Sequence, residues 1–215
     1  GLYLLISLIL TIGGRVLPGF IERGVDYPVR IAHPTWIKVT SLALFIPFFV
    51  ADVFLGQERL AGVLAVALAA VNLLRLARWH TIGIWRRPLL WGLYVAMLFI
   101  VAGFVLYALS VFAATPKLLA VHAFGLGGVG LATLAMMARV ALGHTGRSVL
   151  APPLTVSVAL VLMLCAALTR VVVPMVLPGY YAASVTAAQL LWIAAFAVFL
   201  GRYWRVLTRP RVETL

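Results

Sequence analysis

Residues 88–112 read PLLWGLYVAMLFIVAGFVLYALSVF, an uninterrupted apolar run without one charged side chain. At a rise of about 1.5 Å per residue, a helix of this length is long enough to cross a hydrocarbon core of about 30 Å. Six further apolar stretches surround it, at residues 2–12, 34–55, 59–78, 116–142, 153–177 and 182–207. The sequence therefore predicts an all-α integral membrane bundle of about seven transmembrane helices, forming a single domain over residues 1–215.

The composition of the whole chain supports a membrane protein and excludes most other classes. Of its 215 residues, 65% are hydrophobic and 10% are charged, whereas soluble domains carry about 25% charged residues. The 17 Lys and Arg against 5 Asp and Glu give a net charge of +12, which in a soluble protein would indicate nucleic-acid binding. Here the basic residues fall between the apolar runs, so we expect membrane lipid, and not nucleic acid, as the partner.

The basic residues are divided unequally between the two predicted faces of the membrane. The face reached at the end of the first, third, fifth and seventh segments carries fourteen of them, and the opposite face carries Arg59, Lys117 and Arg170. By the positive-inside rule, the richer face and the C-terminus are cytoplasmic. The first segment is short and begins at Gly1, so we expect either that a preceding part of the protein is missing or that a processed helix starts here.

His122 is the strongest candidate for chemistry inside the predicted membrane segments, where polar groups are costly and raise a functional question. It lies about two turns into the fifth segment and is followed by Gly125, Gly127, Gly128 and Gly130. Such a bare helix surface allows either the close packing of another helix or the approach of a flat macrocycle. On the first interpretation His122 forms an inter-helix hydrogen bond, and on the second it is an axial haem ligand.

A second group of candidates lies at the predicted cytoplasmic ends of the segments. Gly143 suits the left-handed residue that ends a helix, which leaves His144 at the membrane surface beside Arg147. This pair either holds an anionic group or stabilises the helix C-terminus through its positive charge. His122 and His144 are 22 positions apart, or about 33 Å along a continuous helix, so they cannot ligate one metal ion.

Other features of the sequence narrow the choice of function. Asp52 is the one carboxylate in an apolar segment, which argues against a transporter, and we expect it to form inter-helix hydrogen bonds. Met136 and Met137 are soft ligands of the kind that copper(I) prefers. Neighbours on one helix point in different directions, so core packing is the favoured interpretation of this pair. The sequence holds no hydrolase or ATPase motif, and no Cys-x-x-Cys-His for covalent haem attachment.

The fifth segment and its flanks carry a family resemblance. His122-Ala123-Phe124, the glycines through Gly130, and residues 137–147, which read MARVALGHTGR, resemble the NnrS family. Residues 13–18, GGRVLP, are similar to that family's GGRVIP motif, and the resemblance extends along nearly the whole chain. The family usually has further N-terminal helices with a Trp-His-Ala-His type motif. The chain therefore resembles the C-terminal half of such a protein.

This resemblance implies a haem- and copper-containing protein of the bacterial inner membrane, linked to denitrification and nitric oxide stress. It implies His122 as the main axial ligand of a b-type haem and His144 as a second metal ligand. Arg15, Arg139 and Arg147 would then partner anionic groups such as haem propionates. The alternative is an accessory transmembrane subunit of a larger respiratory complex without its own redox group, whose Gly-rich helix is an interface to a partner.

Overall fold

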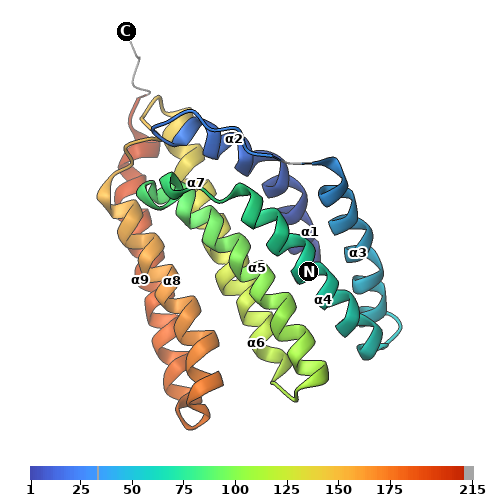
Figure 1. The fold of residues 1–215 in the computed structure, drawn as a ribbon. Coiled ribbons are helices and arrows are strands. Elements are labelled where there is room, and N and C mark those ends of the chain that lie inside the picture. Colours follow the sequence, from blue (N-terminus) through green and yellow to red (C-terminus); the bar gives the residue numbers. More distant parts are fainter. Residues whose placement is uncertain (33, 211–215) are drawn as a thin grey trace.

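The structure is a computed structural model that describes residues 1–32 and 34–210. Every regular element in these ranges is helical, and the helices lie side by side in one bundle (Figure 1). In chain order the elements are α1 (Leu2–Leu8), η1 (Ile9–Gly13), α2 (Gly14–Gly24), α3 (Thr35–Val53), α4 (Glu58–Trp79), η2 (Ile82–Arg86), α5 (Pro88–Phe112), α6 (Lys117–His122), η3 (Ala123–Gly130), α7 (Leu131–His144), α8 (Leu154–Val176), η4 (Pro178–Tyr180) and α9 (Tyr181–Thr208).

Seven helical stretches of the described residues are long and apolar enough to cross a membrane. They are Leu2–Gly24, Thr35–Val53, Glu58–Trp79, Pro88–Phe112, Lys117–His144, Leu154–Val176 and Pro178–Thr208. The predicted fold class is therefore confirmed, and the chain is a multi-pass membrane protein. Prolines begin several of these helices, because a proline at the first turn removes only a backbone N–H that would have no partner there.

The first span is longer than the predicted segment 2–12. The helix continues through a π-helical stretch, η1, and ends at Gly24. The final part, α2, buries Leu17, Pro18 and Ile21 on one side and leaves Arg15 exposed. Such a two-sided helix suits the boundary between headgroups and acyl chains, and α2 lies at the upper end of the bundle in Figure 1.

The expected end of the fifth span was also placed too early. Gly143 lies inside α7, which continues to His144. The left-handed residue is Gly146, with a φ of +71°. The backbone N–H of Arg147 then donates to the carbonyl of Leu142 at 2.9 Å, which satisfies one of the carbonyls left free at a helix end.

α5 forms the centre of the bundle. Most of its side chains are buried, including Leu93, Met97, Phe104 and Tyr107. The α8–α9 pair packs on one side, and α4 packs on the other side with α3 outside it (Figure 1). The outer helices expose large apolar side chains, as membrane-spanning helices do. Trp204 of α9, for example, is 72% exposed.

The bundle has two ends, and each is held together by its own polar contacts. At the end that is uppermost in Figure 1, called here the basic end, Arg87 pairs with Asp26 and also donates to the carbonyl of Leu150 at 2.7 Å. The opposite end contains the C-terminus of α3 and the start of α6. Here Lys117 donates to Asp52 at 2.6 Å. Placement of the basic end in the cytoplasm stays a prediction from the charge distribution.

Candidate functional site

The fifth span changes its helical form at His122. This residue ends α6, and the next eight residues, Ala123–Gly130, form the π-helix η3 before α7 begins. In a π-helix the hydrogen bonds run from i to i+5, which widens the coil, and such segments occur frequently at functional sites. The widened stretch is also the glycine-rich one, so the sequence feature and the backbone irregularity coincide.

The imidazole of His122 is held in one orientation by its own helix. Its Nδ1 lies 2.7 Å from the carbonyl oxygen of Leu118, one turn earlier. Because a carbonyl can only accept, Nδ1 carries the proton, and in the neutral ring Nε2 keeps a free lone pair. Within the described residues, Nε2 has no hydrogen-bond partner. A ring fixed in this way through its other nitrogen is the usual state of a metal-ligating histidine.

A cavity of about 450 Å³ lies beside His122, between the η3 region and the α8–α9 pair. Arg170 of α8 and Gln189 of α9 bring polar side chains to it. The remaining walls are apolar and include Trp192 and Ile193, which belong to the lipid-exposed side of α9. The cavity therefore combines an imidazole, a cation and an apolar wall within a membrane span.

Arg170 is buried, at 9% exposure, and its guanidinium donates to the hydroxyl of Tyr181 at 3.1 Å. The guanidinium carbon also lies 5.0 Å from the centre of the Tyr181 ring, a cation–π contact. No carboxylate of the described residues pairs with it. Arg170 is thus a positive charge held in place by an aromatic side chain and available to an anionic group in the cavity.

Three of the glycines in η3 have sharply different surroundings. A Cβ atom on Gly127 would lie 2.2 Å from the ring of Phe99, and one on Gly128 would lie 2.4 Å from Ile100. These two glycines let α5 approach closely, which supports the helix-packing interpretation at both positions. A Cβ atom on Gly125 would meet nothing within 4 Å. The surface that α5 covers is therefore unavailable both to a macrocycle and to a partner subunit.

A second cavity, of about 430 Å³, lies between α1, α3, α5 and the fifth span, and Asp52 is among its lining residues. The carboxylate of Asp52 accepts hydrogen bonds from Tyr3 at 2.6 Å, Tyr107 at 2.5 Å and Lys117 at 2.6 Å. These residues come from four separate elements, so the network joins α1, α3, α5 and α6. The expectation that Asp52 forms inter-helix hydrogen bonds is confirmed.

The structure places the other predicted site residues far from His122, towards the basic end. Arg139 and His144 follow His122 by 17 and 22 positions in one continuous span, or about 26 and 33 Å along the helix. Among residues 1–32 and 34–210, no three His, Cys, Asp or Glu side chains are close enough to hold a metal together. A role for these residues stays a prediction, and it concerns a place separate from the His122 cavity.

The four predicted site residues towards the basic end contact different neighbours. The guanidinium of Arg139 lies 3.8 Å from the centre of the Phe20 ring of α2. Arg147 donates to the carbonyl of Val206 at 3.3 Å, near the end of α9, as expected of a cation that stabilises helix C-termini. His144 is exposed at the end of α7, and Arg15 is exposed on α2. The remaining histidines are His80, whose Nε2 accepts from Trp85 at 3.1 Å, and His33, which lies outside the described residues.

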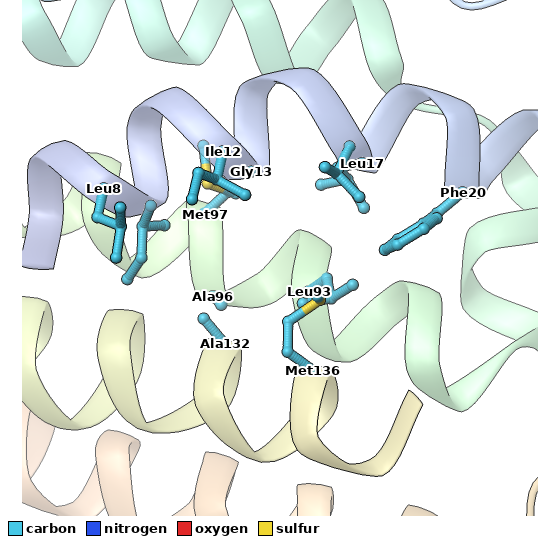
Figure 2. Close-up of a pocket in the computed structure, with 12 residues that line it drawn as sticks. Leu8, Ile12, Gly13, Leu17, Phe20, Leu93, Ala96, Met97, Ala132 and Met136 are labelled. Atoms are coloured by element: carbon cyan, nitrogen blue, oxygen red, sulfur yellow. The ribbon is translucent and has the colours of Figure 1, made fainter. Parts of the chain in front are cut away.

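An apolar cavity of about 150 Å³ lies between the first span, α5 and α7. Figure 2 shows Met97 of α5 and Met136 of α7 among its lining residues, together with Leu93 and Phe20. Met137 is absent from this lining and is 38% exposed. The adjacent methionines therefore point in different directions, as the helical spacing predicts.

Sequence reasoning did not assign a site role to Arg170 or Gln189. The charge count assigned Arg170 to the face opposite the basic end, and the structure buries its side chain against Tyr181. An arginine well inside an apolar segment was the available signal, because such charges are functional candidates by default. The spacing of residues along the chain gave no means of placing α8 and α9 next to His122.

The fold and the cavity define a class: a polytopic membrane protein with a single oriented histidine and a buried arginine at one cavity. The comparison with protein families is specific. Residues 1–211 match the family model described as NnrS protein, and the chain belongs to the NnrS family. No significant match to a curated protein or to a solved structure was found.

Proposed function

We propose that this chain binds a b-type haem through His122 and acts in nitric oxide handling in a bacterial inner membrane. The observation that carries the proposal is the fixed ring of His122, whose Nδ1 donates to Leu118 at 2.7 Å beside a cavity of about 450 Å³. This arrangement leaves Nε2 as the free donor atom for a metal. Family membership supports the association with nitric oxide and denitrification.

The residues around the cavity fit a haem. A haem needs an axial nitrogen, a largely apolar enclosure and a cation for its propionates. His122, the wall residues Trp192 and Ile193, and Arg170 offer these three features. Because Arg139 and Arg147 lie far along the bundle, Arg170 replaces them as the propionate partner of a haem at His122. The absence of Cys-x-x-Cys-His implies non-covalent binding.

When bound, the haem supplies an iron centre that can ligate a diatomic molecule or transfer an electron. The chain's own residues have narrower tasks. His122 would hold the iron through Nε2, Arg170 would neutralise the propionate charge, and Trp192 with its apolar neighbours would form the wall of the cavity. Gln189 brings a side-chain amide to the cavity lining, and it offers a hydrogen bond to a group bound there.

The test is an absorption spectrum of detergent-purified protein, produced with full haem supply, before and after reduction with dithionite. We expect a Soret band and sharp reduced α and β bands in the wild type and in His144→Ala, and their loss in His122→Ala. His144 is the matched control because it is exposed at the other end of the same span. A shift of the Soret band on adding nitric oxide to the reduced protein would support the proposed role.

Two results would overturn the assignment of a haem to His122. A featureless wild-type spectrum would remove haem from this chain and favour the accessory subunit of a respiratory complex, which co-purification of a partner would then support. Unchanged bands in His122→Ala would keep the haem but place it elsewhere.

Copper is measured by elemental analysis of the same samples, with Met136→Leu as the variant that removes a thioether from the cavity in Figure 2.

A further inference from the structure

A cavity of about 180 Å³ at the basic end gathers three cationic side chains. It lies between the first span, the start of α3 and the end of α4, and its lining includes Arg15, Lys38 and Arg75. Gly14 and Trp79 contribute to the same lining. The His122 cavity has a separate set of lining residues and lies towards the other end of the bundle.

Arg75 is the buried member of this group, at 3% exposure. Its guanidinium donates to the carbonyl of Leu10 at 3.2 Å and lies 5.7 Å from the centre of the Trp79 ring. Leu10 belongs to the π-helix η1. A Cβ atom on Gly14 would lie 3.1 Å from Nη1 of Arg75, so the glycine leaves room for the guanidinium. The packing of two spans thus fixes the position of this charge.

Within residues 1–32 and 34–210, no carboxylate forms an ion pair with the charges in this cavity. The ion pairs of the described residues are Arg87 with Asp26 and Lys117 with Asp52, and neither is in this cavity. A buried guanidinium whose charge is not neutralised is costly, and like charges around one cavity repel each other. A bound anion would remove both costs, because a guanidinium donates paired hydrogen bonds that match the oxygens of phosphate and carboxylate groups.

We propose that Arg15, Lys38 and Arg75 form a binding site for one phosphate-type oxyanion. The volume of about 180 Å³ has room for a single such group and not for a macrocycle, so the site is independent of the proposed haem. The phosphate belongs either to the headgroup of an anionic lipid or to a soluble molecule. Both sources carry the same charged oxygens, and both can reach a site at the end of a membrane bundle.

The experiment measures ligand-dependent stabilisation of the full chain. The probes are inorganic phosphate, compared with chloride at equal ionic strength in neutral detergent, and phosphatidylglycerol, compared with phosphatidylcholine in nanodiscs. A ligand that binds only the folded protein raises its unfolding temperature, and the rise grows with the logarithm of the ligand concentration divided by Kd. The test variant is Arg15→Gln with Lys38→Gln, two exposed positions. The control variant is Arg202→Gln with Arg205→Gln. Both arginines are exposed on α9, and their replacement removes as much positive charge as the test variant does.

Stabilisation of the wild type and the control by inorganic phosphate, with at least roughly tenfold weaker binding in the test variant, supports a soluble ligand. The same pattern with phosphatidylglycerol alone supports a lipid headgroup. Arg75→Lys, which keeps the charge but loses the paired donors, should also weaken the binding. If the test variant and the control respond equally to both probes, the site is refuted. Haem content plays no part in this measurement, so the two proposals fail separately.

Discussion

The different surroundings of the glycines in η3 lead to a sharp prediction about stability. Gly127 and Gly125 lie two residues apart in the same π-helix, yet an added methyl group meets very different surroundings. At Gly127 the Cβ atom would lie 2.2 Å from Cγ and Cδ1 of Phe99 and 2.7 Å from its Cβ. At Gly125 it would meet nothing within 4 Å. The same substitution, glycine to alanine, should therefore change the free energy of unfolding in opposite directions.

The magnitudes follow from two opposing contributions. Alanine favours a helix over glycine by about 0.5–1 kcal/mol, because it restricts the unfolded chain. Overpacking of a filled interior costs about 1–3 kcal/mol. Phe99 is 9% exposed and packs in the centre of the bundle, so its ring has little room to withdraw. We expect Gly127→Ala to lose about 1–2 kcal/mol and Gly125→Ala to be neutral or to gain up to about 1 kcal/mol.

The assay is reversible unfolding in mixed detergent micelles, followed by circular dichroism, with the wild type measured beside both variants. A double-mutant cycle with Phe99→Ala tests the cause, because removal of the ring leaves only the Cβ contact at 2.7 Å. The double variant should then be more stable than the sum of the single effects predicts. Equal stability of Gly127→Ala and Gly125→Ala, or strict additivity with Phe99→Ala, would refute the close approach of η3 to α5.

Two further predictions concern hydrogen bonds that join helices. Asp52→Ala should destabilise the protein by about 2–4 kcal/mol, because three donors lose the charged acceptor that they share, a carboxylate whose side chain is 8% exposed. Lys117→Ala should cost less, because Asp52 keeps its two tyrosine donors. Denaturant titration of the two variants checks this order, and equal losses would contradict it. Tyr203→Phe should cost about 1 kcal/mol, because the buried hydroxyl donates to the carbonyl of Ala138 at 3.2 Å; an unchanged unfolding midpoint would show that this bond contributes nothing.

Much of the fold is readable in the sequence because membrane insertion depends on each segment separately. Residues 88–112 were expected as one helix, and α5 has the same bounds. The first span departed most from its predicted bounds. Gly13, Gly14 and Pro18 are signals for a loop in most contexts, but a π-helical turn carries the chain through the glycines, and the proline is accommodated near the start of α2. Packing of this span against α5 therefore outweighed the local preference of these residues for a loop.

The site was only partly predictable for a related reason. His122 stands out in the sequence as a polar residue in an apolar run followed by glycines. Arg170 is also a polar residue in an apolar run, but nothing in the spacing of the chain says that its helix meets His122. The same limit applies to Gly125 and Gly127, which look equivalent in the sequence and differ only in what faces them.

The sequence by itself thus determined the class of protein, the number of spans and the concentration of positive charge at one end, since hydropathy and charge add up residue by residue along each segment. The tertiary structure decided which polar groups meet: Asp52 with two tyrosines and a lysine, and His122 with Arg170 at one cavity. The physical reason is that lipid is as apolar as leucine, so hydrophobicity places a helix in the membrane without choosing its neighbours. That choice rests on close packing and on hydrogen bonds between spans, which exist only once the helices have assembled.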